Sequence, residues 1–434
     1  MYKKIITALA IMSAVFAFLL FSCKLPVGCS DKSAAAIGKL VMWGTLPADQ
    51  MADVLNKFNV DAKTYSVSYE EMPEDRFEDI LVNALANGEG PDMILTNYKT
   101  ILSQKQRISP YPLTSFPVND YKNAYIDGAS IFLTGDGILA FPVTVEPMMM
   151  FVNRDIISKN GLATVPAYWD DLLSVTPKIT KRDQNGSFTS YGVGLGSMTN
   201  VVHAKEIIMS LVESLGQNPV SVDNNGALHF SGNVPLSEQS VVLPLRESLK
   251  LFTQFSDPNK ESYSWNNYTG MTDLDAFSAG KLALYFGYSG ENKDIIAKNE
   301  RLNFYLSPFP QARGYESRAN SMKMYGVAVM KRTPPALLNT AYVAQSTLAT
   351  SKYANLIDIA TTKLSPIRSV LSADQNLDSG IKESVLVTRG WYDLKESAST
   401  NLLTIAVNDI VSGKKGASEA AASFVSALND IYAK

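Results

Sequence analysis

The feature of this sequence that most constrains its fold is an early alternation of strand-like and helix-like segments. Residues 39–43, 65–69 and 92–95 carry the apolar or alternating patterns of strands. Between them, residues 51–58 and 77–85 place apolar side chains at helical spacing. Strands that alternate with helices in this way form a parallel sheet covered by helices. Because such sheets bind ligands beyond the carboxyl ends of their strands, we expect a ligand site where the first and third strands end.

The middle and the end of the chain carry turn and helix signals. Residues 183–186 and 223–226 both end in Asn-Gly. We predict a hairpin turn at each, because Asn-Gly tolerates the positive φ values that such turns need. From Phe424 to Tyr432 the apolar residues share one helical face, and Ser418 is the expected N-cap of that helix. The whole pattern indicates an α/β fold.

Composition bounds the size of the fold and its partners. A length of 434 residues corresponds to about two or three domain-sized units. Hydrophobic residues make up 46% of the chain and charged residues 19%, which is typical of a globular protein with a sizeable core. The 39 basic and 42 acidic side chains give a formal net charge of -3. A nucleic-acid partner usually requires a basic face, so we expect none.

The N-terminus has the features of a bacterial lipoprotein export signal. After a short basic start, residues 5–21 form an uncharged apolar run that ends just before Cys23. We therefore predict a signal peptide at residues 1–22, lipidation of Cys23 and a tether at residues 23–36. The alternative is an uncleaved membrane anchor. The apolar run is short for a span of roughly 20 residues, and Lys24 follows it almost at once.

The cysteine count bears on localisation and on disulfides. The chain has two cysteines, and a lipid on Cys23 leaves Cys29 without a partner. We therefore expect no disulfide, so the mature chain is held by its core alone. Acyl chains would anchor the exported protein to the outer face of the cytoplasmic membrane, in the periplasm or at the cell surface.

Several short motifs occur in a specific order along the chain. They are Gly-Glu-Gly-Pro-Asp at 88–92, Ala-Phe-Pro-Val-Thr-Val-Glu at 140–146, Phe-Val-Asn-Arg-Asp at 151–155, Gly-Leu at 161–162 with Pro-Ala-Tyr-Trp-Asp-Asp-Leu at 166–172, Ala-Phe-Ser-Ala-Gly-Lys-Leu-Ala-Leu at 276–284, Tyr-Gly-Val-Ala-Val at 325–329, and Ile-Val-Ser-Gly-Lys at 410–414. In this order and spacing they resemble the family 1 extracellular solute-binding proteins, the group that includes maltose-binding protein. The resemblance covers nearly the whole chain after residue 38.

The resemblance implies a fold and a function. The fold is a two-lobed, periplasmic-binding-protein-like α/β structure of type II, in which hinge crossings join the lobes around a ligand cleft. We expect lobe 1 at residues 37–141 and 308–350, and lobe 2 at residues 142–307 and 351–434. The implied function is that of a substrate-binding lipoprotein of an ABC importer. It closes around a small solute, expected to be a mono- or oligosaccharide, delivers it to the permease subunits, and is a monomer.

Candidate ligand contacts follow partly from position in the predicted fold. A sugar site requires aromatic planes for stacking and donors and acceptors held in place by burial. Trp43 and Thr45 follow the first predicted strand and Asn97 follows the third, which places them at the rim of the cleft. Trp265 lies in a polar loop rich in Tyr and Asn, and Trp391 precedes the last helical region. Both tryptophans are equally consistent with core packing.

The resemblance adds further candidates. Glu146 lies in the hinge motif, where the family usually has an acidic residue that faces the cleft. Its alternative role is an interlobe salt bridge. Tyr288 and Ser289 fall where the family usually has a Trp, which is absent here, and Tyr288 is the expected replacement. This departure leaves the sugar open, and it leaves room for polyols, glycerol phosphates or peptides as the solute. The predicted ligand-binding residues are Trp43, Thr45, Asn97, Glu146, Trp265, Tyr288, Ser289 and Trp391.

No motif in the sequence supports catalysis. His203 and His229 are isolated in the sequence, and the chain has no zinc-binding His-Glu-x-x-His pattern. A Ser-x-x-Lys pattern at residues 412–415 lacks the companion motifs of the enzymes that use it. We therefore expect no catalytic residue, no metal and no cofactor. The alternatives to an importer component are a sensor input or an adhesin of the same fold, and then an exported enzyme.

Overall fold

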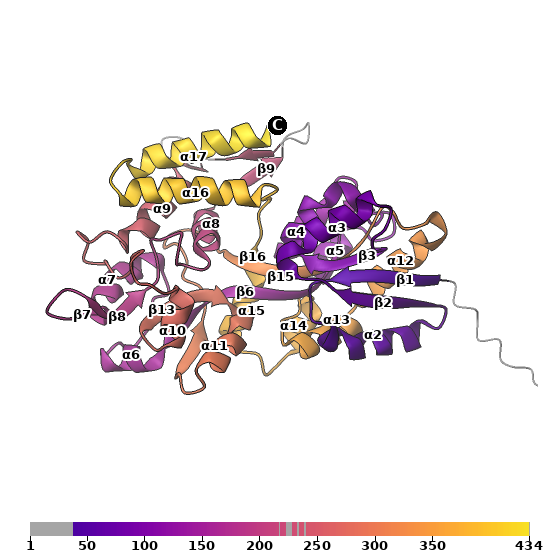
Figure 1. Cartoon of the computed structure of the whole chain (residues 1–434), viewed down its shortest axis with the longest axis horizontal. Coiled ribbons are helices and arrows are strands. Elements are labelled where there is room, and N and C mark those ends of the chain that lie inside the picture. Colours follow the sequence, from indigo (N-terminus) through magenta and orange to yellow (C-terminus); the bar gives the residue numbers. More distant parts are fainter. Residues whose placement is uncertain (1–37, 217, 223–227, 232–233, 238–239, 434) are drawn as a thin grey trace, which may run out of the picture.

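The computed structural model describes residues 38–216, 218–222, 228–231, 234–237 and 240–433. The predicted signal peptide, the lipidation site Cys23 and the tether lie outside these described residues, as does the turn predicted at 223–226. Within the described ranges, no helix is long and apolar enough to span a bilayer. The chain forms two lobes that lie side by side along the long axis of the molecule (Figure 1).

One sheet runs through both lobes. Its strands are β1 (Gly38–Gly44), β2 (Tyr65–Glu71), β3 (Met93–Asn97), β6 (Phe141–Asn153), β7 (Lys181–Arg182), β8 (Phe188–Val193), β13 (Leu282–Tyr288), β14 (Phe304–Ser307), β15 (Asn320–Val329) and β16 (Thr388–Arg389). The strand order is β2-β1-β3-β15-β6-β13-β8-β7, with β14 paired to β6 and β16 paired to β15. Strand β1 is parallel to both β2 and β3, which confirms the predicted parallel unit.

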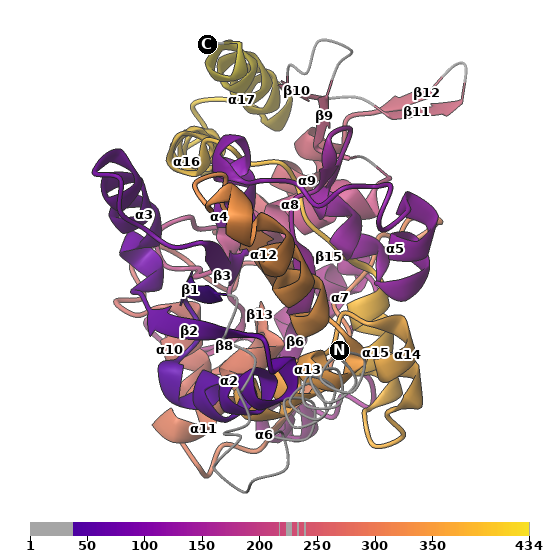
Figure 2. The same ribbon diagram turned by 90° about the vertical axis from the view of Figure 1, so that its right-hand side faces the viewer.

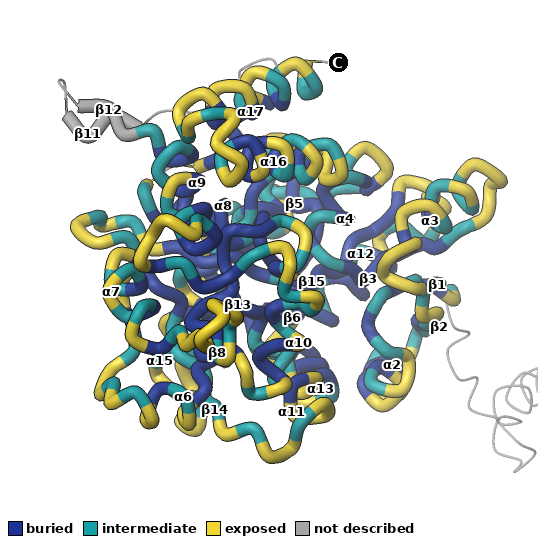
Figure 3. The backbone as a smooth tube through the Cα atoms, turned by 60° about the vertical axis from the view of Figure 1, so that its left-hand side comes forward, coloured by how far each residue is buried: buried dark blue, intermediate teal, exposed yellow. Residues whose placement is uncertain are grey.

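Helices cover the sheet in each lobe. The first lobe has α2 (Ala48–Ala62), α3 (Phe77–Ala86), α4 (Tyr98–Ser103), α5 (Val118–Ala124), α12 (Pro335–Leu348), α13 (Ser351–Thr361) and α14 (Arg368–Ala373). The second lobe has α6 (Arg154–Lys159), α7 (Trp169–Ile179), α8 (Ala204–Ser214), α9 (Pro244–Gln254), α10 (Asp273–Ser278), α11 (Asn292–Lys298), α16 (Glu396–Val411) and α17 (Ala417–Tyr432). Helix α15 (Ser379–Leu386) contacts β6 and β14 and packs against both cores. The helix faces that point away from the sheet are exposed, whereas central strands such as β6 and β13 are buried (Figure 3).

Shorter elements complete the structure. They are β4 (Leu133–Thr134), β5 (Gly137–Ile138), β9 (Val220–Val222), β10 (Leu228–Phe230), β11 (Val234–Ser237), β12 (Ser240–Val242) and the 3-10 helices η2 (Glu74–Arg76), η3 (Lys105–Arg107), η4 (Asp127–Phe132) and η5 (Ser289–Glu291). Strands β11 and β12 form an antiparallel pair that projects from the second lobe (Figure 2). The segment between β9 and β10 holds the second predicted hairpin turn, which therefore cannot be placed among the described residues.

Strand β6 joins the two lobes. Its first part, from Phe141 to Pro147, pairs with β15, whereas Met148 to Val152 pair with β13. Every residue of β6 is buried, as expected for a strand in the interior of the sheet. The segment that the sequence assigned to a hinge strand is therefore shared by both halves of the molecule.

The apolar side chains form two cores, one in each lobe. The first core includes Tyr353 and Ile357 of α13, although we expected residues 351–434 in lobe 2. Helix α13 packs on α2, where the Tyr353 ring lies edge-on to Phe58 at 5.2 Å. Further along the chain, Trp391 belongs to the second core. The difference arises because an amphipathic helix specifies that one face is buried but not which lobe buries it.

Two local expectations can be compared with the structure. The predicted hairpin at residues 183–186 connects β7 and β8, where Gly186 has a φ of 81°. The carboxylate of Asp183 accepts the N–H groups of Asn185 and Ser187, as an Asx-type turn requires. The last helix is α17, as predicted, but Gly416 is its N-cap instead of Ser418.

Candidate functional site

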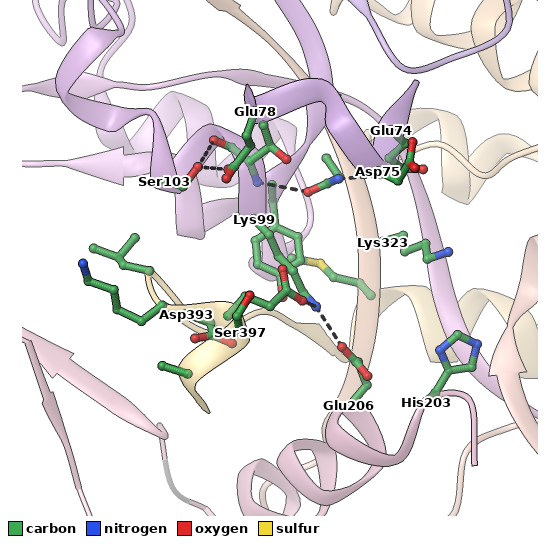
Figure 4. A pocket seen from close by; sticks show the side chains of 18 of the residues that line it. Glu74, Asp75, Glu78, Lys99, Ser103, His203, Glu206, Lys323, Asp393 and Ser397 are labelled. Atoms are coloured by element: carbon green, nitrogen blue, oxygen red, sulfur yellow. Dashed lines mark hydrogen bonds and ion pairs between the residues drawn. The ribbon is translucent and has the colours of Figure 1, made fainter. Parts of the chain in front are cut away.

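A cavity of about 1040 Å³ lies between the lobes. From the first lobe and β15 it is lined by Glu74, Asp75, Glu78, Asp79, Asn97, Tyr98, Lys99, Thr100, Ser103, Met322 and Lys323. From the second lobe and the segment before α16 it is lined by Val202, His203, Glu206, Tyr288, Asp393, Leu394, Lys395, Glu396, Ser397 and Ala398. Charged side chains from both lobes face the same space (Figure 4). This is the arrangement expected for a ligand site that closes between two lobes.

The end of β3 builds one wall of the cavity. Asn97 is the last residue of β3, and its side-chain Oδ1 accepts the N–H of Thr100 at 3.1 Å to cap α4. The other end of the same amide donates to Glu74 Oε1 at 2.9 Å. The cap starts a short helix that carries Lys99 into the cavity. The carboxyl end of β3 therefore supplies site residues, as the parallel sheet predicted.

Two carboxylates of the second lobe share the Lys99 ammonium. Glu206 Oε1 lies 2.8 Å and Glu396 Oε1 lies 2.7 Å from Lys99 Nζ. Burial by itself would raise the pKa of Glu206, but the adjacent Lys99 ammonium outweighs burial and lowers that pKa to about 2. The same carboxylates raise the pKa of Lys99 above its ordinary value despite burial. Lys99 and Glu206 are therefore both ionised at neutral pH.

A second polar cluster supports the wall around His203. The Nε2 of His203 lies 2.6 Å from Glu291 Oε1, and the hydroxyl of Tyr285 donates to the other Glu291 oxygen. Burial opposes ionisation of Glu291, yet the hydrogen bond from His203 gives this carboxyl a net lowered pKa. Asp273 Oδ1 accepts the backbone N–H of Val202 at 2.9 Å, so it fixes the turn that places Val202 and His203 on the cavity.

Replacing Asp273 with asparagine should raise the free energy of unfolding more at pH 8 than at pH 5. Asp273 is buried and its Oδ2 has no hydrogen-bond partner among the described residues, so burial raises its pKa from 3.8 to about 7. The folded state therefore favours the protonated form, and this penalty on stability is absent below pH 3.8, grows as the pH rises and is complete above about 7. Asparagine stays neutral and keeps an acceptor for Val202. The gain in free energy of unfolding should be about 2–3 kcal/mol larger at pH 8 than at pH 5.

Urea unfolding of both proteins at the two pH values measures this difference. The matched control is Asp275→Asn, on the same helix but exposed and bonded to Lys298. The pKa of Asp275 is lowered, so this control should show no gain at pH 8. A gain from Asp273→Asn that is the same at both pH values would contradict the argument.

Two of the predicted ligand-binding residues line the cavity, and they are Asn97 and Tyr288. The Tyr288 side chain is enclosed, with His203 edge-on at 4.9 Å and the Lys323 ammonium 4.9 Å from the ring centre. Its hydroxyl lies 3.3 Å from Ser321 Oγ. With an exposure of 3%, the ring offers only a small part of its surface to a ligand.

Glu146 and Ser289 do not line the cavity. Glu146 is buried and forms an ion pair with Lys363, which follows α13 of the first lobe. Ser289 is half-buried, and a Cβ on the next residue, Gly290, would overlap Glu146 Oε2. The structure thus shows an ion pair for Glu146, and its partner comes from the first lobe.

The other predicted contacts lie in the two cores or near them. Trp43 packs half-buried against the first core, and Thr45 Oγ1 lies 3.4 Å from Thr96 Oγ1. Trp265 and Trp391 are buried in the second core. None of the four lines the cavity. Of the two readings open for Trp265 and Trp391, the structure places both in the core.

Sequence reasoning did not select the charged residues of the cavity, in particular Lys99, Glu206, Lys323, Asp393 and Glu396. One signal was available. Lys205, Glu206 and Glu213 are charged residues in a helix whose other residues are apolar or small, and ten of the eleven residues of α8 are buried. Charges in a buried helix need partners, which marks such positions for function or for ion pairing.

The comparisons with known proteins identify the family. Residues 45–337 match the model of the bacterial extracellular solute-binding proteins. Curated relatives from Brucella abortus and Brucella suis, named only as candidate binding proteins, are 23% identical over 283 residues. The match covers 63% of this chain, and the chain spans 63% of the length of these relatives.

Solved structures show the same fold. The sugar-binding protein of Xanthomonas citri is 14% identical and matches with a TM-score of 0.73 over 91% of this chain and 97% of its own. The cyclic alpha-maltosyl-1,6-maltose binding protein of Arthrobacter globiformis is also 14% identical, with a TM-score of 0.74 over 91% and 98% of the two chains. The family model covers more than half of the sequence. The chain therefore belongs to the bacterial extracellular solute-binding proteins and has their two-lobed fold.

Proposed function

We propose that this protein binds a mono- or oligosaccharide in the interlobe cavity and delivers it to the permease subunits of an ABC importer. The observation that carries the proposal is the cavity itself, which draws polar side chains from both lobes. Its volume of about 1040 Å³ is at the upper end of the range of about 300–1,000 Å³ for small-molecule sites. The space therefore accommodates more than a single sugar ring.

The chemistry of the lining supports a polyhydroxylated solute. Asn97 and Lys323 offer donors, Glu74 offers acceptors, and Ser103 and Ser397 offer both. A solute rich in hydroxyl groups can satisfy such a mixed set, whereas an apolar solute would leave the charges desolvated. Two structural neighbours are described in complex with maltotetraose and with mannobiose, which agrees with this choice of solute. We assign Asn97 and Tyr288 as contacts to the sugar.

The remaining elements of the proposal concern location and assembly. Cys23 would carry the lipid that holds the protein at the outer face of the cytoplasmic membrane, within reach of the permease. The two-lobed fold makes a complete site within one chain, so we propose that the protein acts as a monomer. A sensor or adhesin would use the same fold without a permease, and genome context with two permease genes would favour the importer.

A thermal-shift screen of residues 30–434 tests the solute class. Both hydrophobic cores lie within residues 38–433, so a protein of residues 30–434 keeps the side chains that stabilise the fold. Saccharides, polyols, amino acids and peptides are compared, and a solute at a hundredfold excess over Kd should stabilise the fold by about 2.7 kcal/mol. We expect a saccharide to raise the melting temperature. A shift with amino acids or peptides alone would contradict the sugar proposal, and no shift at all would favour the sensor or adhesin.

A pair of matched variants tests the site. Asn97→Ser removes the amide from the cavity but keeps a residue that can cap α4. Asn153→Ser makes the same change at the N-cap of α6, which does not line the cavity. We expect the first variant to weaken saccharide binding by about tenfold, the effect of about 1.4 kcal/mol for one lost hydrogen bond. Equal affinities in the two variants would place the sugar elsewhere.

A further inference from the structure

Lys99 forms ion pairs across the cavity between helices of different lobes. It lies on α4 of the first lobe, whereas Glu206 lies in the first turn of α8 and Glu396 begins α16, both in the second lobe. The two N–O distances are 2.8 and 2.7 Å. Figure 4 shows the Lys99 side chain reaching from the first-lobe ribbon toward Glu206.

An exposed ion pair of this length would contribute little, because solvent screens it and ordering two long side chains costs entropy. The Lys99–Glu206 pair differs in its burial. The Lys99 side chain is 21% exposed and that of Glu206 is 16% exposed, whereas Glu396 is 52% exposed. The sheltered pair with Glu206 is therefore the stronger of the two, because screening is weaker where solvent is excluded.

The two ends of the pair are fixed to different cores. Ile101 and Leu102 of α4 are buried in the first core, and Ile207 and Ile208 of α8 are buried in the second. When the lobes move apart, the ammonium must follow the first core and the carboxylate the second. Coulomb attraction at contact distance is then lost to water, so the pair favours the arrangement in which the lobes are close.

We propose that Lys99 is a positioning residue that couples solute binding to lobe closure. Its ion pairs with Glu206 and Glu396 form a latch that raises the fraction of molecules in which the lobes are closed. The apparent affinity for a solute scales with that fraction, so the latch strengthens binding even of an uncharged solute. This inference rests on the proposed function, because a latch matters only for a protein whose lobes open and close.

The distance between the lobes measures the latch without any sugar. In residues 30–434, which contain no native cysteine, spin labels on Asp49→Cys of α2 and Lys178→Cys of α7 report that distance. For Lys99→Met we expect the long-distance population to rise relative to the short one by on the order of tenfold. About 0.5 M NaCl should produce a smaller rise in the unchanged protein, because the pair is partly sheltered from screening, and little rise in Lys99→Met.

Two variants separate the latch from a general loss of charge or of folding. Lys395→Met removes another lysine of the same cavity, one that is exposed and has no ion pair among the described residues, and should leave the distances unchanged. Lys99→Arg keeps the charge and should retain the short distance and the response to salt. Melting curves identify any variant that fails to fold. If Lys99→Met fails to fold, the salt response of the unchanged protein decides the result, because without the latch NaCl would leave the distances unchanged.

The outcomes distinguish the latch from the proposed function. The latch is overturned if Lys99→Met and the unchanged protein give the same distances at low salt, or if Lys395→Met opens the lobes as much. A saccharide that binds both proteins equally would overturn it too, and would leave the proposed function standing. If Lys99 controls the distance but no saccharide binds, the latch is retained and the proposed solute is rejected.

Discussion

Replacing Lys205 with methionine should lower the free energy of unfolding by about 3–5 kcal/mol, because it leaves a buried carboxylate without its counter-charge. Lys205 forms an ion pair with Asp393, and their side chains are 6% and 0% exposed. The ammonium also donates to Ser399 Oγ at 2.8 Å and to Thr400 Oγ1 at 3.0 Å. These bonds tie α8 to the segment that carries Asp393 and Glu396 into the cavity, so the loss falls on the second lobe.

Urea unfolding followed by tryptophan fluorescence measures this loss, since three of the four tryptophans lie in the second core. Removing both charges with Lys205→Met and Asp393→Leu should recover much of the stability, because no unpaired charge then remains. The matched control is Lys352→Met, whose exposed pair with Asp61 should contribute little. If the Lys205 and Lys352 variants unfold alike, the buried pair does not hold the second lobe.

Replacing Trp265 with alanine should cost about 3–5 kcal/mol, the effect of removing a large side chain from a packed core. Trp265 is fully buried, its indole N–H donates to Asn200 Oδ1 at 3.0 Å, and its ring lies edge-on to Tyr191 at 4.9 Å. Trp265→Phe keeps most of the volume and loses the hydrogen bond, so about 1–2 kcal/mol is expected. Thermal and urea unfolding of the two variants measure these costs.

The same variants test whether Trp265 contributes to binding. Because Trp265 does not line the cavity, the folded fraction of Trp265→Phe should bind a saccharide with unchanged affinity. Trp43→Ala serves as a comparison, since Trp43 is half-buried against the first core and should cost less stability. If Trp265→Phe binds the saccharide more weakly but is as stable as the unchanged protein, Trp265 belongs to the binding site.

Asn97 and Lys99 illustrate how far the sequence reaches into the site. Asn97 could be predicted because it ends a parallel strand, and the carboxyl ends of such strands face the ligand. Lys99 lies only two residues further along, yet its role depends on Glu206, which is 107 residues away in the sequence. A local pattern contains no information about a partner at that separation, so the ion pairs of the cavity were not predicted.

Trp265 shows the same limit, because the sequence suggested a ligand contact for a residue that belongs to the core. Trp265 lies among polar residues, and such a neighbourhood suggested a sugar-facing loop. In the structure, that loop folds over β8, and the ring enters the second core between Tyr191 and Asn200. Aromatic residues serve cores and sites equally well, so only the position of the loop decides which one applies.

The sequence by itself determined the α/β fold, the parallel β2-β1-β3 unit and the passage of residues 141–153 between the lobes. The fold class and the parallel unit follow from periodicity, which specifies the buried face of each element. The passage between the lobes is what the resemblance to the solute-binding family implies from the order of the motifs. Only the tertiary structure decided that α13 joins the first lobe and that Lys99 meets Glu206 across the cavity. The physical reason is that an apolar face or a charge specifies the kind of partner it needs, whereas folding in three dimensions selects which partner it receives.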